Sequence, residues 1–515
     1  MTFDHSPYEG NEYLAKSPHN LTIFELRQLD DPDFWAWAGA FRKDVVHAWD
    51  ELGVPVTGGR SADEIVDQFR RLATLDVSGM SALDDLTGTT DCILNNSTVG
   101  SVCNQFFPTM LKTKDIDAVS LTGISIYSMF ADDSRLGSFV EQVRNMLVND
   151  PFSFFSHPIT MPETVDLRSW LVNEASDQDT RIWFSTKKAP KNALHVADAE
   201  MDALLGEGLV LPEQIVGAGP WHVRRYNRLT RIMDIAKMFR HIAGGTPATN
   251  FRPSTAKHLY LRFTEHISQT EKVVVYDPSA GWGGRILGAM ACGNEREIHY
   301  LGTDPNPDHW MPDLGITKYE YLANYFHGNV RTHHRNTCEI FRVGSEDIAD
   351  DPKFQAYRGK VDFVFTSPPY FAAEGYSDDP RQSHMKFRTY EAWRDGFLKP
   401  TLETSAAWLK ENRFVCINIA DVRVGDRVLP LQNDASNILL RLGLAKHPTL
   451  KMVMSEARLG SKETDRGTPT MRNFCKVNGQ RRKYEPILVF QKLIGHDKMW
   501  AGEDLSPEML EEMAR

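Results

Sequence analysis

The pattern of apolar and polar residues changes near residue 245. Before this point the chain shows short amphipathic helical patterns; in residues 61–75, apolar side chains recur at the spacing of one buried helix face. These side chains are Ile65, Phe69 and Leu72. Small and polar residues at 243–250 mark the break. We therefore expect a mostly helical accessory region over residues 1–245, followed by a domain of another kind.

After the break, strand-like and helix-like patterns alternate up to residue 492. The strand-like runs are residues 272–277, 298–304, 338–341, 361–365, 413–421, 449–455 and 484–492, and the helix-like runs are residues 284–293, 314–326, 389–412 and 433–443. This alternation predicts an α/β fold with a mostly parallel, doubly wound sheet. Such sheets bind ligands at the carboxyl ends of their strands, near the point where the strand order reverses.

Length and composition bound the possible classes of protein. A chain of 515 residues exceeds a single core, so we place the α/β domain at residues 246–495 and a helical tail at 496–515. No apolar run approaches the ~20 residues of a membrane helix, and the first residues lack the regions of a signal peptide. We expect a soluble protein without a membrane partner, in the cytoplasm of a bacterial, archaeal or phage-infected cell.

Cysteine spacing and net charge exclude some classes of binding site. The six cysteines include no Cys-x-x-Cys pair, so we expect free thiols in a reducing compartment and no metal site. The net charge of −11 argues against a nonspecific nucleic-acid coat. Two local segments, residues 221–241 and 458–484, are nevertheless strongly basic. Either one alone is typical of a solvated surface.

Polar residues and glycines follow the first three predicted strands. Asp277 could accept hydrogen bonds from a ligand, and Gly281, Gly283 and Gly284 would let the backbone approach one closely, although a tight turn explains them equally. Asp304 follows the second strand, where an acid commonly binds ribose hydroxyls; the alternative is a helix cap. Three further acceptors follow the third strand and could bind an adenine amino group. They are Ser345, Glu346 and Asp347.

The fourth strand ends in Thr366-Ser367-Pro368-Pro369-Tyr370. Two prolines stop a strand because proline cannot donate to the ladder. That explanation accounts for the prolines but not for the serine and tyrosine beside them.

The run DPSAGWGG from Asp277, followed by Ser367-Pro368-Pro369-Tyr370, resembles the S-adenosyl-L-methionine (SAM)-dependent DNA amino methyltransferases. These enzymes methylate the exocyclic nitrogen of cytosine or adenine. Their turn reads Asp-Pro-Phe-x-Gly-x-Gly, so Ser279 replaces the usual Phe. Residues 250–263 resemble the segment upstream of the turn, which contacts the methionine end of the cofactor. The resemblance covers about residues 250–492.

The resemblance implies a Rossmann-like methyltransferase core, SAM as cofactor and double-stranded DNA as partner. The catalytic residues it implies are Ser367, Pro368, Pro369 and Tyr370. The cofactor-binding residues it implies are Arg252, Pro253, Ser254, Asp277, Ser279, Ala280, Gly281, Gly283, Asp304, Glu346 and Asp347.

The loop has a physical rationale. An aromatic amine is a poor nucleophile because its lone pair is delocalised into the ring. The Ser367 side-chain oxygen and the Pro368 carbonyl can hold the amine hydrogens out of the ring plane, and the prolines fix both acceptors in place. Tyr370 offers a stacking face to a flipped base, worth about 1–3 kcal/mol.

Several alternatives stay open. A serine at position 367 favours cytosine N4 as the target, with adenine N6 a close second; methylation of RNA guanine N2 or of protein glutamine is less expected. A protein of another class, a noncatalytic nucleic-acid-binding module, would show a damaged turn or loop. Residues 1–245 could recognise the target sequence, and residues 371–390 could either cover the base or form a surface loop. Oligomeric state and any partner restriction nuclease are not predicted.

Overall fold

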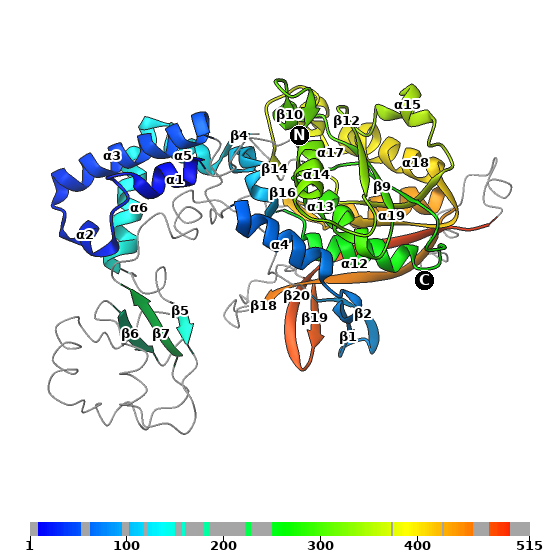
Figure 1. Ribbon diagram of the computed structural model, residues 1–515, viewed down its shortest axis with the longest axis horizontal. Coiled ribbons are helices and arrows are strands. Elements are labelled where there is room, and N and C mark those ends of the chain that lie inside the picture. Colours follow the sequence, from blue (N-terminus) through cyan, green and yellow to red (C-terminus); the bar gives the residue numbers. More distant parts are fainter. Residues whose placement is uncertain are drawn as a thin grey trace. The chain divides into compact units, whose positions relative to one another are not determined.

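A computed structural model describes most of the chain (Figure 1). The described residues are 9–52, 62–94, 102–117, 122–149, 157–159, 180–185, 222–227, 250–371, 374–424, 427–456 and 473–494. They divide into two compact units. The core unit contains residues 60–124 and 247–515, and the N-terminal unit contains residues 8–59 and 125–246. Residues 60–124 thus belong with the α/β core although they precede the boundary expected at residue 246.

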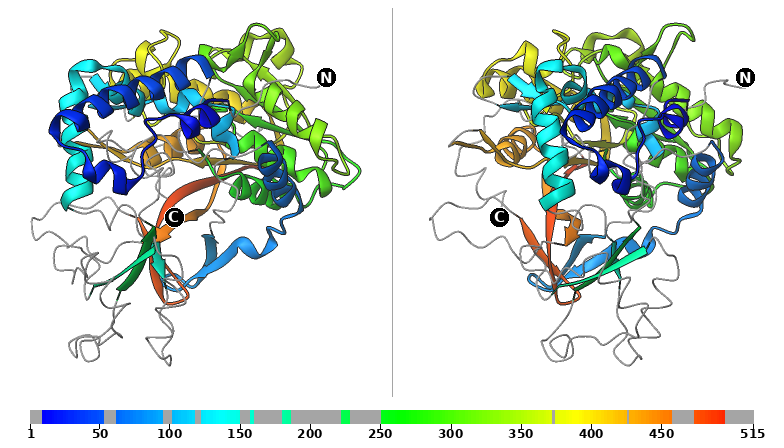
Figure 2. Two further views of the ribbon diagram at one scale, coloured as in Figure 1. Left: turned by 60° about the vertical axis from the view of Figure 1, so that its left-hand side comes forward. Right: turned by 90° about the vertical axis from the view of Figure 1, so that its left-hand side faces the viewer.

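A ten-stranded sheet forms the centre of the core unit (Figures 1 and 2). In spatial order its strands are β1 (Ser81–Asp84), β2 (Thr89–Ile93), β18 (Ala445–Glu456), β20 (Gln480–Lys492), β15 (Leu409–Asn418), β13 (Val361–Thr366), β8 (Val273–Asp277), β9 (Ile298–Thr303) and β12 (Thr337–Phe341), with β19 (Phe474–Val477) paired to β20. The strands from β12 to β15 are parallel, and β20 runs antiparallel to both its neighbours β15 and β18. The predicted α/β fold with a mostly parallel, Rossmann-like sheet is confirmed.

Helices cover both faces of this sheet. The helices of the core unit are α4 (Ala62–Thr74), α12 (Pro253–Thr264), α13 (Gly284–Ala291), α14 (Lys318–Asn329), α15 (Pro352–Gln355), α16 (Ser383–Lys386), α17 (Tyr390–Trp393), α18 (Lys399–Trp408) and α19 (Leu431–Arg441). Phe363 of β13 stacks on Phe263 of α12, whereas the next residue, Val364, belongs to the apolar cluster that includes Leu402 of α18. Because successive strand residues point to opposite faces, α12 and α18 lie on opposite sides of the sheet.

Two strand pairs and one three-stranded sheet, all of short strands, complete the described part of the core unit. They are β10 (Trp310–Met311) with β11 (Ile316–Thr317), β16 (Val422–Val424) with β17 (Arg427–Leu429), and β14 (Glu374–Gly375) with β3 (Lys114–Asp117) and β4 (Thr122–Ile124).

The expectation of a helix up to residue 412 is wrong at its end. Helix α18 stops at Trp408, and residues 409–412 already belong to strand β15. The reason lies in Asp362, which is buried in the central strand β13. Lys410 Nζ lies 2.6 Å from its carboxylate, and Arg413 Nε lies 3.5 Å away. A buried carboxylate requires such cations, and the extended backbone of β15 brings them there.

Helix α4 is fixed to the core by a buried lysine. The helix and its inward side chains Ile65, Phe69 and Leu72 are as predicted, all three fully buried. Lys257 of α12 is also fully buried, and its ammonium donates to the carbonyls of Leu72 (3.2 Å) and Ala73 (2.9 Å) at the end of α4. A cation at the C-terminus of a helix satisfies the last carbonyls and the helix dipole. This contact joins residues 62–75 to the α/β core.

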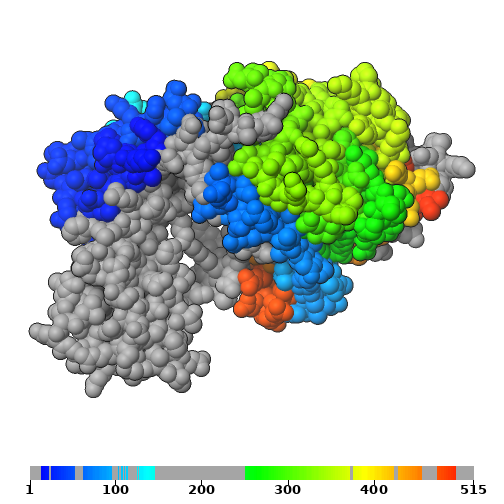
Figure 3. Space-filling view, in the orientation of Figure 1, coloured from blue at the N-terminus to red at the C-terminus, as the bar shows by residue number. Residues whose placement is uncertain are grey.

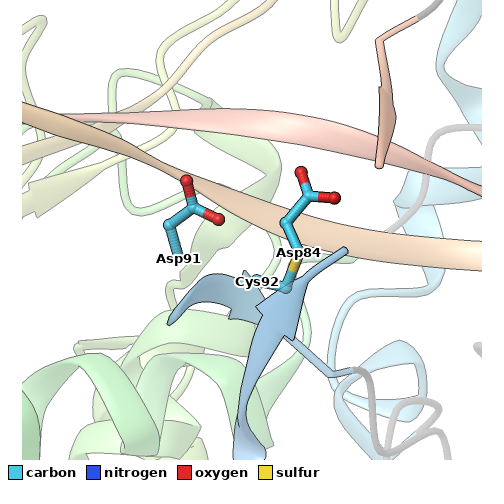
Figure 4. A group of neighbouring side chains, drawn as sticks. All are labelled: Asp84, Asp91 and Cys92. Atoms are coloured by element: carbon cyan, nitrogen blue, oxygen red, sulfur yellow. The ribbon is translucent and has the colours of Figure 1, made fainter. Parts of the chain in front are cut away.

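The hairpin β1–β2 carries a cluster of buried polar groups, Asp84, Asp91 and Cys92 (Figure 4). Their ligand atoms lie within 4.8 Å of one another, close enough to hold a metal ion. However, Lys451 Nζ of β18 lies 2.6 Å from Asp84 and 3.0 Å from Asp91. The ammonium of Lys451 therefore balances the two carboxylates and links the side chains of the hairpin to the neighbouring strand β18.

The N-terminal unit is largely helical in its described part, as predicted. Its elements are α1 (Glu9–Lys16), α2 (Ile23–Gln28), α3 (Asp31–His47), α5 (Ile126–Ala131), α6 (Leu136–Asn149) and an antiparallel sheet of β5 (His157–Ile159), β7 (His222–Asn227) and β6 (Thr180–Ser185). Its core contains Phe34, Trp37, Phe41, Phe130 and Phe139.

Several other expectations can be compared with the structure. The six cysteines are free thiols, as predicted. Strand β7 contains the start of the first basic segment, while residues 228–241 and the tail 496–515 lie outside the described residues. None of the helices in the described ranges is long and apolar enough to cross a membrane.

Candidate active site

Two of the predicted motifs meet where the strand order reverses. Strands β8 and β13 are neighbours and pair in parallel, although β9 and β12 come between them in sequence. Asp277 ends β8 and Thr366 ends β13, so the glycine-rich turn and the Ser-Pro-Pro-Tyr loop emerge side by side. This is the position at which doubly wound sheets bind their ligands.

The turn after β8 depends on glycine. Gly281 and Gly283 have φ angles of 60° and 82°, in the left-handed region that glycine adopts without strain. Gly283 precedes helix α13, and the Gly281 amide donates to Asp304 at 3.0 Å. The turn is therefore connected to the end of the neighbouring strand β9.

Asp277 fixes the glycine-rich turn through hydrogen bonds to its side chain. Its side chain is buried and accepts hydrogen bonds from Arg285 Nε at 2.7 Å and from the Tyr300 hydroxyl at 2.6 Å. The Arg285 guanidinium also donates to the Ser279 carbonyl. Burial works against the charge of Arg285, but the Asp277 carboxylate outweighs it and raises the pKa of Arg285. The position of Ser279 thus depends on a buried ion pair, and neither Arg285 nor Tyr300 was singled out from the sequence.

Asp304 is likewise engaged within the protein. One carboxylate oxygen accepts from the Gly281 amide and, at 2.9 Å, from the Tyr319 hydroxyl; the other accepts from the Asn306 amide at 2.9 Å. Burial raises the pKa of Asp304, but His309 at 3.5 Å and these hydrogen bonds outweigh it, so the pKa is lowered. The helix-cap alternative does not hold for Asp304, because Asn306 caps the turn that follows. A ribose at this position would share the carboxylate with the glycine turn.

The acids after β12 point toward a lysine. Lys386 Nζ of α16 lies 2.9 Å from Glu346 and 2.5 Å from Asp347. Burial raises the pKa of Glu346, and Lys386 opposes that shift. The second carboxylate oxygen of Glu346 is buried and accepts no hydrogen bond within the described part of the chain. Ser345, by contrast, bonds Thr401 of α18 at 2.7 Å and is buried there.

The Ser-Pro-Pro-Tyr loop leaves Ser367 partly exposed and Pro368 buried. The Tyr370 hydroxyl donates to the Asn418 carbonyl at the end of β15 (3.3 Å), which fixes one end of the ring. The next residue, Phe371, has a φ of 53°, an uncommon conformation for a bulky side chain. Its buried ring packs against Trp393 at 6.0 Å. Phe371 therefore holds a sharp turn directly after the Ser-Pro-Pro-Tyr loop, and no sequence signal marks it.

The segment after the loop is fixed at two points, strand β14 in the small sheet with β3 and β4, and the buried start of helix α16. Strand β14 pairs with β3, through Glu374 and Asp115, and Ser383 and His384 at the start of α16 are buried. Strand β14 and the start of α16 are thus fixed in the fold, whereas Asp378, Arg381 and Arg388 between and after them are exposed.

The glycine-rich turn is also covered by an aromatic residue from the N-terminal part of the core unit, far away in sequence. The Phe107 ring lies 5.0 Å from Tyr319 and 5.1 Å from His309, and its atoms fill the space beside Gly283. A side chain at position 283 would collide with this ring. Phe107 lies far from the turn in sequence, so no local pattern predicts the contact.

The upstream segment approaches the turn through α12. Arg252 and Pro253 begin this helix, and Ser254 is fully buried in its first turn. Burial lowers the pKa of Arg252, and the carboxylate of Glu485 opposes the shift. Helix α12 packs closely on α13 because Gly288 has no side chain.

Comparisons with known proteins were made for the sequence and the structure. No protein-family model and no curated protein matches the sequence. The structure is similar to a SAM-dependent methyltransferase from Methanosarcina mazei, with 9% identity, 44% of this chain and 95% of that chain covered, and a TM-score of 0.25. It is similar to an rRNA methyltransferase from Streptomyces viridochromogenes, with 14% identity, 51% and 91% covered, and a TM-score of 0.26.

A candidate DNA modification methylase from Thermus thermophilus is also similar, with 22% identity over 32% of this chain and 52% of that chain, and a TM-score of 0.19. Matches of this strength carry no argument about substrate. The fold is identified by the strand order and by the parallel pairing of the central strands.

Proposed function

We propose that this protein is a SAM-dependent methyltransferase that modifies the exocyclic N4 amine of cytosine in double-stranded DNA. One observation carries the proposal: the glycine-rich turn and the Ser-Pro-Pro-Tyr loop follow neighbouring strands at the reversal of the sheet. A cofactor on the turn and an amine on the loop would thus be side by side, as methyl transfer requires.

The residues around the turn suit the cofactor. The backbone of Gly281 and Gly283 leaves room for a ligand, and the buried free oxygen of Glu346 is an acceptor suited to an adenine amino group. Arg252, at the start of α12, would lie toward the methionine end. When bound, SAM supplies a methyl group activated by its sulfonium.

Ser367 and Pro368 would prepare the amine. The serine hydroxyl oxygen and the proline carbonyl oxygen would each accept a hydrogen bond from one amine N–H, which localises the nitrogen lone pair. SAM would supply the methyl group to the amine nitrogen held by Ser367 and Pro368 and would leave as the neutral thioether, and the proton lost from the nitrogen would pass to water. The Tyr370 ring stacks on the flipped base.

Two measurements on the full chain test this proposal. Equilibrium dialysis with labelled SAM should show binding, and incubation with duplex DNA should transfer label to the DNA. Ser367→Ala should bind SAM normally but transfer methyl groups about 100-fold or more slowly, as expected for loss of a preorganised catalytic hydrogen bond. A chain that binds no SAM and transfers no label would instead fit a noncatalytic nucleic-acid-binding module.

A further inference from the structure

Two strands extend the sheet past the edge that contains the candidate active site. Asn418, the last residue of β15, pairs with Ile487 of β20, but β20 begins seven residues earlier at Gln480. At about 3.3 Å per residue, this part of β20 projects roughly 20 Å beyond the carboxyl end of β15. Because β15 and β13 are parallel, the projection is at the same edge as Ser367.

One face of the projecting hairpin β19–β20 contains buried apolar residues, with Arg482 opposite Cys475, and the other face carries three cations. Cys475 and Val477 are buried and pack toward β2 and β18. Side chains alternate along a strand, so the intervening residues of β19 and their partners on β20 point the other way. These outward residues are Phe474 with its partner Lys483, and Lys476 with its partner Arg481.

The cations of this outward face are not neutralised. Lys476 and Arg481 lie directly opposite each other, an arrangement of like charges that destabilises a sheet. Neither they nor Lys483 form an ion pair with any residue that the structure describes. The Arg481 guanidinium stacks on Phe474 at 4.0 Å, which orients it without removing its charge. In a protein of net charge −11, a cationic face that opposes its own folding indicates an anionic partner.

The hairpin β1–β2 braces this projection. The Lys476 amide donates to Asp84 at 2.9 Å, the Asp85 amide donates to the Lys476 carbonyl at 2.7 Å, and the Gly479 amide donates to Asp85 at 2.8 Å. Figure 3 shows the two hairpins side by side in red and blue. A two-stranded hairpin alone is marginally stable, so the brace makes a rigid ribbon of it.

We propose that the outward face of the β19–β20 hairpin is the surface that holds duplex DNA, with Lys476, Arg481 and Lys483 on its phosphates. A two-stranded ribbon fits the major groove of B-form DNA, which is about 12 Å wide, whereas the major groove of A-form RNA is too narrow. The inference rests on the proposed function for its choice of DNA, but the binding it describes can be measured without methyl transfer.

The test compares two triple variants of the full chain that lose the same charge. The hairpin variant is Lys476→Gln, Arg481→Gln and Lys483→Gln. The control is Arg331→Gln, Lys353→Gln and Lys360→Gln. Lys353 is an exposed residue of α15, and Arg331 and Lys360 are exposed residues of the connections that lead into the amino ends of β12 and β13. Binding of a fluorescein-labelled DNA duplex is measured by anisotropy over a range of salt concentrations, together with SAM binding.

We expect the affinity of the hairpin variant for the duplex to fall roughly tenfold or more. The slope of the logarithm of the binding constant against the logarithm of the salt concentration should become shallower by about 0.9 for each lost phosphate contact, or about 2.7 for all three. The control should change little, and both should bind SAM as the unchanged chain does. Equal losses in both variants, or no loss in the hairpin variant, would overturn the inference. Failure of the unchanged chain to bind SAM would instead contradict the proposed function.

Discussion

The close packing of α12 on α13 makes Gly288 a test of how the proposed cofactor site is positioned. Gly288 lies in the interior of α13, where alanine is normally the better helix former by about 1 kcal/mol. A Cβ at this position would nevertheless lie 2.6 Å from the Cβ of Ala256 and 2.7 Å from the carbonyl oxygen of Pro253, both in α12. The substitution Gly288→Ala thus brings helix propensity and packing into conflict.

The cost of overpacking should be at least as large as the gain in helix propensity. Carbon atoms in contact stay about 3.5–4.0 Å apart, so α12 and α13 must separate by about 1 Å. Overpacking a core costs about 1–3 kcal/mol, against the gain of about 1 kcal/mol in propensity. The difference leaves a net loss of up to about 2 kcal/mol in the free energy of unfolding for Gly288→Ala. The substitution should also displace Arg252 and Pro253, and a displacement of about 1 Å in positioning groups can slow a reaction about 100-fold.

Urea unfolding followed by near-ultraviolet circular dichroism measures the stability, and isothermal titration calorimetry measures SAM binding. Gly328→Ala is the matched control, because Gly328 is an exposed residue of α14 with no atom near its missing Cβ. This control should leave stability unchanged or raise it by up to about 1 kcal/mol. If Gly288→Ala behaved like the control and bound SAM normally, the close contact of the two helices would not position the site.

Three further results are expected. Tyr370→Ala should bind SAM within about twofold of the unchanged chain but lose base stacking worth about 1–3 kcal/mol, seen as slower single-turnover methyl transfer; equal rates would contradict this role. Lys451→Met should destabilise the chain by about 3–5 kcal/mol in urea unfolding because it leaves Asp84 and Asp91 buried without their cation. The pKa of Asp84 is lowered, because hydrogen bonds from Lys451 and two backbone amides outweigh the effect of burial. The stabilisation by the ionised carboxylate is therefore present above the ordinary carboxyl pKa of about 3.9 and lost as the pH falls through the lowered pKa. If the loss of stability caused by Lys451→Met were the same at that lower pH, this explanation would be wrong. Asp85→Ala should weaken binding of duplex DNA by releasing the hairpin brace, whereas an account based on charge alone requires tighter binding.

Local patterns predicted the elements that surround the candidate site. The apolar run of β13 and the prolines that end it are contiguous in sequence, and so are the glycines of the turn. In a parallel sheet, functional residues usually follow the carboxyl ends of the strands. A correct order of strands therefore places Asp277 and Ser367 near each other without further information.

Contacts between distant residues were not predictable in this way. Phe107 and Lys257 join the N-terminal part of the core unit to the turn and to α12, and nothing in their local sequence indicates a partner so far along the chain. The left-handed backbone of Phe371 is likewise imposed by the packing of its ring. The strand at 409–412 follows from the buried charge of Asp362, which overrides a helical pattern.

The central claim is that the chain methylates an exocyclic base amine in DNA through the Ser-Pro-Pro-Tyr loop. Mass spectrometry of nucleosides from duplex DNA, after incubation with the protein and SAM carrying an isotopically labelled methyl group, tests it most directly. The account predicts labelled N4-methylcytosine, strongly reduced with Ser367→Ala. Labelled N6-methyladenine would correct the target base but keep the site. Unlabelled DNA from a protein that binds SAM and DNA, or full labelling by Ser367→Ala, would contradict the account.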